Sequence, residues 1–217
     1  ISNAQRRPVP QANWARTIYH GLPEDLLTPQ PAKQSYLAVL GRIAPEKGVD
    51  RAIRIATRCG IPLKVAAKVD RADQDYYDEL ISPLISNNPL IDYIGEIGDN
   101  EKSEFLSGAI GLLVPIDWPE PFGLVMIEAM ACGTPVIAYN RGSAPEIVED
   151  GLTGFVVEDE TSAVAAVGRL AGLDRGAIRK RFEQRFTARR MALDYLAAYR
   201  SLTEATRPHI HLVASAE

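Results

Sequence analysis

The sequence predicts an α/β fold with a Rossmann-like, doubly wound parallel sheet of six strands. Two observations support this class: six short apolar runs follow one another from residue 36, and segments with helical spacing of apolar residues separate them. Strands that alternate with helices form a parallel sheet covered on both faces. Because crossovers between parallel strands are right-handed, we expect the order 3-2-1-4-5-6, which reverses between the first and fourth strands.

The six apolar runs define the strands in order along the chain. They lie at residues 36–40, 63–69, 91–94, 110–114, 134–139 and 154–157. The helices between them are indicated by apolar residues three or four positions apart, such as Tyr77, Leu80 and Leu84 in the second helix. Two further helices are predicted after the last strand, at 160–172 and 175–205.

Residues 1–35 precede this alternation and contain five prolines. Within them only residues 14–19 have the composition of a strand, so we interpret the segment as a lead-in to the domain formed by residues 36–205. Residues 206–217 are predicted to be a frayed tail. The chain begins with Ile1 instead of Met, and we therefore expect it to be part of a longer protein.

Composition and charge narrow the function classes. Apolar residues make up 46% of the chain and charged residues 24%, as in ordinary globular domains, which excludes a collagen-like or wholly disordered chain. The formal net charge of −4 disfavours nucleic acid as a partner. No apolar run approaches the roughly 18 residues of a membrane span, and no signal-peptide pattern opens the chain, so we expect a soluble, cytoplasmic protein.

The loops that leave the first and fourth strands form the predicted ligand site, because ligands of such sheets bind where the strand order reverses. In the first loop, Arg42 and Lys47 lie between two glycines, and Gly41 allows a ligand to approach the backbone closely. A planar guanidinium and a mobile ammonium together suit a diphosphate. The alternative is a solvated helix start in which Glu46 pairs with Lys47 or Arg42.

A helix predicted at 122–132 follows the fourth strand. The free N–H groups of Phe122, Gly123 and Leu124 at its start favour an anion such as a phosphate. Glu128 lies in the second turn of this otherwise apolar helix, and its acceptor-only carboxylate suits the hydroxyl groups of a ribose. Glu120 precedes the helix and is expected to face whatever is attached to the phosphates.

Alternatives remain for these side chains. In one, Glu128 pairs with a core arginine or lysine and Glu120 is an exposed loop charge. Trp118 either borders the pocket or packs on the core. The chain contains neither the G-x-G-x-x-G pattern of dinucleotide-binding folds nor the G-x-x-x-x-G-K-[ST] pattern of phosphate-binding loops, so both classes are disfavoured.

Together these motifs resemble a known family. Glu120 and Glu128, with seven residues between them, are similar to the E-x7-E signature of the retaining glycosyltransferase family 4, the glycosyl transferases of group 1, which has the GT-B fold. Three further stretches, at 41–48, 142–147 and 151–155, are similar to motifs of the same family in the same order. The resemblance covers residues 36–205 and implies the C-terminal half of a GT-B fold.

The resemblance implies that a hexose is moved, with retention of anomeric configuration, from a UDP-, GDP- or ADP-sugar. It implies no metal and no other cofactor. Its catalytic residues would be Arg42 and Lys47, on the diphosphate, and Glu120, beside C1 of the donor sugar. The implied substrate-binding residues are Glu128 at the ribose, Gly41, Phe122, Gly123 and Leu124 near the phosphates, and Glu96 and Ile97 near the base.

The resemblance also implies that residues 1–35 are the end of an N-terminal domain and the linker after it, and that the last helix packs back toward that domain. The missing domain is then a partner and binds most of the acceptor, which is a sugar, a lipid or a small molecule. With a lipid acceptor, the arginine-rich run 175–190, otherwise a solvated helix face, would be attracted to the inner face of a membrane. Two other functions stay open: a noncatalytic nucleotide-binding module of the same fold, and a Rossmann oxidoreductase.

Overall fold

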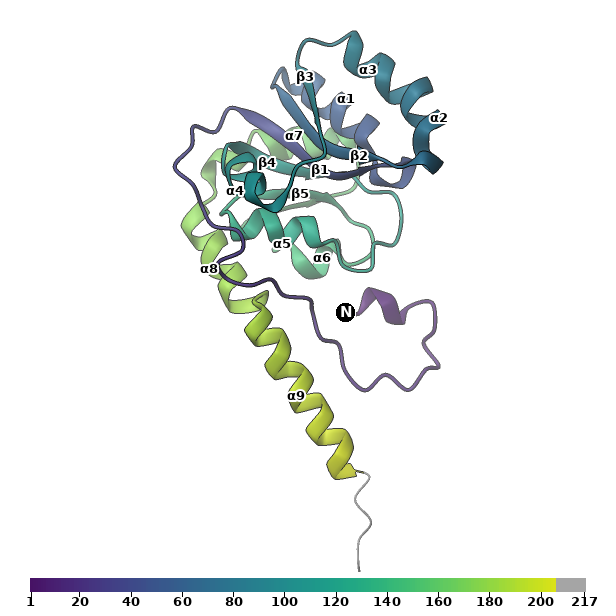
Figure 1. Ribbon diagram of the computed structural model, residues 1–217, viewed down its shortest axis with the longest axis vertical. Coiled ribbons are helices and arrows are strands. Elements are labelled where there is room, and N and C mark those ends of the chain that lie inside the picture. The colour runs from purple at the N-terminus through teal and green to yellow at the C-terminus, as the bar shows by residue number, and fades with distance from the viewer. Residues whose placement is uncertain (206–217) are drawn as a thin grey trace, which may run out of the picture.

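The protein is built on one six-stranded, all-parallel sheet (Figure 1). The computed structural model describes residues 1–205. The strands are β1 (Tyr36–Ile43), β2 (Leu63–Val69), β3 (Ile91–Gly95), β4 (Ala109–Val114), β5 (Val136–Tyr139) and β6 (Gly154–Val157). Their order is β3-β2-β1-β4-β5-β6, which confirms the order expected from the sequence and makes β1 and β4 neighbours at its point of reversal.

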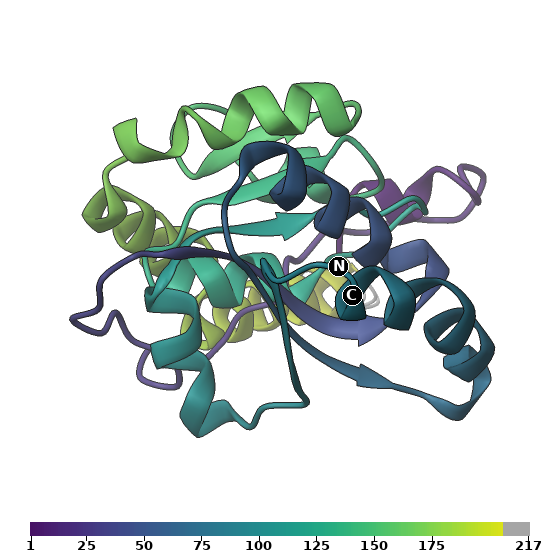
Figure 2. The same cartoon turned by 90° about the horizontal axis from the view of Figure 1, so that it is seen from above.

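Helices cover both faces of the sheet (Figures 1 and 2). They are α1 (Val49–Cys59), α2 (Gln74–Tyr76), α3 (Ser82–Ser86), α4 (Asp99–Ser107), α5 (Leu124–Ala131), α6 (Ala144–Ile147), α7 (Glu160–Val167), α8 (Arg175–Arg185) and α9 (Ala188–Ala205). A π-helical turn at Tyr77–Ile81 and short 3-10 helices at Ala4–Arg6, Pro45–Lys47, Arg71–Asp73 and Leu170–Gly172 complete the elements. The core accordingly forms two clusters. One includes Met126 and Phe182 of α5 and α8, and the other includes Ile53 and Ala163 of α1 and α7.

The C-terminal helices are shorter than predicted. The segment 160–172 is α7 followed by a 3-10 turn, and the segment 175–205 is divided into α8 and α9. At this division the N–H of Leu22 donates to the carbonyl of Phe186 at 2.9 Å, and the N–H of Ala188 donates to the carbonyl of Leu22 at 2.8 Å. Pairing with the lead-in therefore replaces helical hydrogen bonds at this point of the chain.

The strand predicted at 14–19 is wrong, because this part of the lead-in is irregular. The carbonyl groups of Tyr19 and His20 accept hydrogen bonds from the guanidinium of Arg190 at 2.9 and 2.8 Å. Buried backbone acceptors need partners, and here a side chain supplies the donors that a neighbouring strand would otherwise supply. The apolar composition of the segment reflects packing, since Ile18 is buried.

The arginine-rich run 175–190 is not the solvated face expected from its composition. Arg175 donates to the carbonyl of Ala109 at 3.0 Å and to the hydroxyl of Thr134 at 2.7 Å. Arg179 donates to the carbonyl of Leu27 in the lead-in at 2.8 Å. These guanidinium groups are turned toward carbonyl groups of the domain because a planar fork of donors can satisfy several buried acceptors at once.

The final helix, α9, extends away from the body of the domain (Figure 1). Leu193, Leu196 and Tyr199 lie on it and are 56%, 51% and 59% exposed. The helical spacing of apolar residues that predicted this helix is therefore present, but no other part of residues 1–205 covers these side chains.

Candidate functional site

The loops after β1 and β4 meet at the carboxyl ends of their strands, as expected from the strand order. The N–H of Asp117 donates to the carbonyl of Glu46 at 2.9 Å. Arg51, at the start of α1, donates to the carbonyl of Pro115 at 3.3 Å and pairs with Asp117 at 3.2 Å. These contacts fasten the loop that carries Lys47 to the loop that carries Glu120.

A small hollow of about 140 Å³ lies between these two loops and the start of α5. Its polar lining consists of the side chains of Arg42, Lys47 and Glu120, which the sequence predicts to bind a ligand, and its floor is formed by the apolar ends of β1 and β4. The lining residues are Val39, Leu40, Gly41, Arg42, Lys47, Leu113, Val114, Ile116, Glu120, Gly123, Leu124 and Val125.

A second hollow of about 320 Å³ adjoins the first. It is lined by Leu40, Gly41, Ala66, Glu96, Ile97, Lys102, Leu124, Val125 and Glu128. The two hollows share Leu40, Gly41, Leu124 and Val125, so they are neighbouring halves of one crevice over the sheet. An elongated ligand with an anionic end would place that end between Lys47 and the start of α5.

Glu120 is held in the first hollow and is not an exposed loop charge, since its side chain is 12% exposed. Its Oε2 accepts a hydrogen bond from Lys47 Nζ at 2.6 Å and another from Trp118 Nε1 at 2.8 Å. Trp118 also packs against the core. Packing of Trp118 on the core is therefore confirmed, whereas Trp118 lines neither hollow and meets the site through its hydrogen bond to Glu120.

Glu128 lies in the wall of the second hollow and forms the lysine pair that the sequence left as an alternative. Its Oε1 is 3.0 Å from Nζ of Lys102, which also lies 2.9 Å from Asp99. Burial alone would lower the pKa of Lys102, but hydrogen bonds to Asp99 and Glu128 outweigh burial and hold this pKa above its ordinary value. Lys102 is thus a firmly charged partner of Glu128, and no sequence pattern pointed to it.

Arg42 is paired with carboxylates around the first hollow. Its guanidinium lies 2.8 Å from Glu46, 3.2 Å from Asp73 and 3.5 Å from Asp70. The alternative in which Glu46 pairs with Arg42 is therefore present in this state, whereas Lys47 is paired with Glu120. Because the Arg42 side chain is 41% exposed, these pairs are partly screened by solvent.

Helix α5 begins at Leu124 and ends at Ala131, slightly inside the predicted bounds of 122–132. Gly123 precedes it with φ of +78°, a conformation that favours glycine. Within residues 1–205 no acceptor meets the N–H groups of Gly123 and Leu124, as is usual in the first turn of a helix. They line the first hollow, where the N-terminal end of the helix dipole favours an anion.

Phe122 differs from the other predicted site residues, because its side chain is buried in the core and lines neither hollow. Its ring centroid lies 5.0 Å from that of His20, 6.1 Å from that of Tyr19 and 6.2 Å from that of Phe186. Phe122 can therefore contribute to the site only through its backbone, while its ring anchors the loop to the lead-in.

The turn after β5 supports the backbone of Glu120, a role that the sequence alone did not indicate. The buried Ser143 donates its N–H to the carbonyl of Glu120 at 2.9 Å and its hydroxyl to the carbonyl of Phe122 at 2.8 Å. At Gly142 a Cβ atom would lie 2.3 Å from the backbone N and O atoms of Glu120, and φ is +55°. Only glycine permits this close approach without displacing Glu120.

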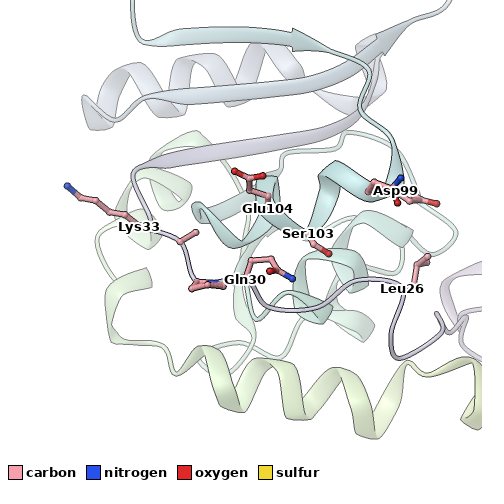
Figure 3. Close-up of a pocket in the computed structure, with 9 residues that line it drawn as sticks. Leu26, Gln30, Lys33, Asp99, Ser103 and Glu104 are labelled. Atoms are coloured by element: carbon pink, nitrogen blue, oxygen red, sulfur yellow. The ribbon is translucent and has the colours of Figure 1, made fainter.

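A larger hollow, of about 730 Å³, lies elsewhere, between the lead-in and α4 (Figure 3). Its lining includes Gln30, Asp99 and Glu104, and Lys33 points away from the hollow (Figure 3). It contains none of the residues expected to bind a ligand. Size alone therefore does not identify the functional site, whereas the smaller crevice combines strand ends, a helix start and converging charges.

The structure describes residues 1–205. Among them, no helix has both the length and the apolar character needed to cross a membrane. Nor does this part of the chain bring together three or more His, Cys, Asp or Glu side chains that could hold a metal ion.

Comparison with known proteins gives a family match and several similar folds. A sequence model of the family described as "Glycosyl transferases group 1" matches residues 28–187. The D-inositol 3-phosphate glycosyltransferase of Mycobacterium tuberculosis (strain ATCC 25618 / H37Rv) is 30% identical over 175 residues, which are 73% of this chain and 34% of that protein. The chain thus spans about a third of the length of this curated relative.

Among solved structures, AviGT4, a glycosyltransferase involved in avilamycin A biosynthesis, has a TM-score of 0.81 and 28% identity, with 94% of this chain and 63% of that chain covered. Sucrose-phosphate synthase from Thermosynechococcus elongatus has a TM-score of 0.78 and 27% identity, with 94% and 58% covered. Anabaena HepE in complex with UDP and glucose has a TM-score of 0.71 and 22% identity over 86% and 57% of the chains, and shares the fold.

Proposed function

Because the chain belongs to the glycosyl transferases of group 1, we propose that it is the donor-binding part of an enzyme that moves a hexose from a nucleoside-diphosphate sugar to an acceptor. The observation that carries this proposal is the two-part crevice, with Lys47, Glu120 and a helix start in one half and Glu128 in the other. A nucleoside diphosphate has the matching order of groups, since its phosphates and its ribose are adjacent.

In this proposal the diphosphate occupies the first hollow. Lys47 and Arg42 bind its oxygens, and the N–H groups of Gly123 and Leu124 and the open backbone at Gly41 approach it. Arg42 would exchange at least one of its carboxylate partners for phosphate. Anabaena HepE, a protein of the same fold, has been solved in complex with UDP, which supports a nucleotide ligand for this fold.

The nucleoside occupies the second hollow. The carboxylate of Glu128 accepts hydrogen bonds from the ribose hydroxyl groups while its Oε1 stays paired with Lys102. The backbone around Glu96 and Ile97, which also line this hollow, meets the base. Backbone groups can read a base by hydrogen bonding, so the choice between UDP, GDP and ADP depends on this loop.

We propose that transfer proceeds with retention and is assisted by charge stabilisation in the first hollow. As the bond between C1 and the diphosphate breaks, negative charge grows on the leaving diphosphate, where Lys47, Arg42 and the start of α5 stabilise it. Positive charge grows at C1, beside the carboxylate of Glu120. We infer that two protein cations and a helix end supply the charge that a metal ion supplies in other transferases, so that no metal is required.

We propose further that an additional N-terminal domain binds the acceptor, with residues 1–35 as the end of that domain and its linker. The exposed apolar side chains Leu193, Leu196 and Tyr199 of α9 then pack against it. The acceptor is a sugar, a lipid or a small molecule. We propose that the enzyme is cytoplasmic, and peripheral to the membrane if its acceptor is a lipid.

The donor site is tested by titrating the chain with UDP, GDP, ADP and NADH in a calorimeter. We expect one nucleoside diphosphate to bind and Lys47→Ala to weaken it about tenfold or more, because a hydrogen bond from a charged group is lost. Lys33→Ala is the matched control for loss of one lysine. Lys33 lies at the hollow between the lead-in and α4 (Figure 3) and lines neither half of the crevice. Tighter binding of NADH than of any nucleoside diphosphate would instead support an oxidoreductase.

A noncatalytic nucleotide-binding module of the same fold is the second candidate function. It would bind the same nucleotide with the same dependence on Lys47. The two candidate functions differ in turnover. A longer protein that includes the N-terminal domain transfers sugar if the chain is part of a transferase, and does not if the chain is a noncatalytic module.

A further inference from the structure

Lys47 and Glu120, which line the first hollow, form a closed triangle with Trp118 beside it. The same atom, Oε2 of Glu120, accepts hydrogen bonds from Lys47 Nζ at 2.6 Å and from Trp118 Nε1 at 2.8 Å. The third side is the Lys47 ammonium over the indole ring, 5.2 Å from its centroid. The Lys47 and Glu120 side chains are 28% and 12% exposed, so solvent screens their pair only in part.

This arrangement conflicts with donor binding in one respect. Lys47 is paired with a carboxylate at the place where the proposed function requires it to meet a diphosphate. A carboxylate and a diphosphate repel each other, and both favour the same ammonium. Arrival of the diphosphate therefore competes with Glu120 for Lys47.

Trp118 differs from Lys47 because its donor is neutral and rigidly placed. The N–H of Glu120 donates to the carbonyl of Trp118 at 2.8 Å, and the ring packs on the core. An indole N–H is a neutral donor, so phosphate attracts it less strongly than it attracts the Lys47 ammonium. It can remain on the carboxylate after Lys47 has left.

We propose that Trp118 is a positioning residue, whose indole N–H holds Glu120 in place while Lys47 transfers from Glu120 to the donor diphosphate. The Lys47–Glu120 pair is then the resting arrangement of the empty site. This inference rests on the proposed function and adds a step to it: the diphosphate displaces a carboxylate, and Trp118 keeps that carboxylate beside the sugar.

Two variants separate the contributions of Glu120 and Trp118 to the binding of diphosphate. Glu120→Gln removes the competing charge, so pyrophosphate and UDP bind about three- to tenfold more tightly than to the parent chain. Trp118→Phe keeps an aromatic ring under Lys47 and removes the N–H donor together with part of the indole. It leaves Glu120 without a partner once Lys47 has moved, so UDP binds about five- to tenfold more weakly.

The decisive measurement is a double-mutant cycle by calorimetry with UDP. The effect of Trp118→Phe falls below about twofold in the Glu120→Gln background, because the indole acts through the carboxylate. Trp14→Phe is the matched control for loss of a tryptophan, since Trp14 lies in the lead-in with its N–H on the carbonyl of Val9. Glu104→Gln, an exposed position on α4, is the control for loss of one negative charge.

A spectroscopic measurement gives an independent answer, even if Trp118→Phe does not fold. The chain has two tryptophans, so Trp14→Phe leaves Trp118 as the only one. Its fluorescence changes on addition of pyrophosphate or UDP because the Lys47 ammonium leaves its ring.

The outcomes are distinguishable. Equal effects of Trp118→Phe in both backgrounds, or unchanged Trp118 emission while UDP binds, overturn this inference and leave the proposed function intact. No binding of UDP, GDP or ADP to the parent chain overturns both.

Discussion

Glu120 and Glu128 are almost equally buried but have different surroundings. Their side chains are 12% and 13% exposed, and each is paired with a lysine from another element, Lys47 for Glu120 and Lys102 for Glu128. The spacing of the two carboxylates in the sequence is enough to place one before α5 and the other in its second turn. The lysines come from elsewhere in the chain, so only the fold assigns each to its carboxylate.

Glu128→Ala tests the role of this carboxylate at the scale of the residue. Loss of hydrogen bonds to a charged acceptor costs about 1.5–3 kcal/mol, so UDP is expected to bind roughly 10- to 100-fold more weakly. Pyrophosphate has no ribose and is expected to bind Glu128→Ala as it binds the parent chain. Calorimetric titration with both ligands checks this difference.

The comparison with pyrophosphate separates a ribose contact from general damage to the site. A variant that binds both ligands equally poorly has lost the diphosphate hollow, and the assignment of Glu128 to the ribose would then fail. Circular dichroism of the variant shows whether the domain still folds.

At the scale of elements, α8 fastens the loops of the domain together. Arg181 and Arg185 both bind Oε1 of Glu149, in the loop before β6, and Arg185 also donates to the carbonyl of Glu146 at 2.7 Å. Burial alone would raise the pKa of Glu149, but the two arginines outweigh burial and hold this pKa below its ordinary value. The ionised form of Glu149 therefore stabilises the fold.

Glu149→Gln is expected to lower the free energy of unfolding at pH 7 by about 1–2 kcal/mol, since charge-assisted hydrogen bonds to Arg181 and Arg185 are lost. The folded pKa is depressed, so the contribution is fully present above the unfolded value of about 4.3 and is lost as the pH falls through the lower folded value. Urea denaturation of parent and variant at several pH values checks this. A stability difference that persists unchanged below pH 3 would contradict the electrostatic origin.

At the scale of the whole molecule, α9 extends away from the body of the domain (Figure 1), and its apolar side chains Leu193, Leu196 and Tyr199 are exposed. The residues that would bind the donor are all in this chain, whereas none is assigned to the acceptor. We therefore expect that this chain can bind the donor without transferring the sugar.

We expect the 217-residue chain to bind its nucleotide but to transfer sugar at least about 100-fold more slowly than a longer protein with the N-terminal domain, because the acceptor is not positioned at C1. Product formation from a labelled donor sugar, measured for both proteins with the same acceptor, checks this. Equal rates would show that residues 1–217 contain the acceptor site as well.

Much of the fold could be predicted because it depends on local patterns. Continuous apolar runs predicted six buried strands, and the right-handedness of crossovers then predicted their order and the position of the crevice. The predictions failed where a distant contact outweighed local composition. Residues 14–19 have the composition of a strand, but Arg190 satisfies carbonyl groups at the end of this segment, and pairing of Leu22 beside Phe186 divides the last helix.

The sequence by itself thus determined the sheet, its order, and the two loops and one helix start that form the crevice, because periodicity, glycine placement and chain handedness are local or topological properties. Tertiary structure alone decided which side chains meet: Glu120 with Lys47 and Trp118, and Glu128 with Lys102. The physical reason is that ion pairs and hydrogen bonds depend on distances of a few ångströms between residues far apart in the chain. Such distances are set only when the whole core has packed.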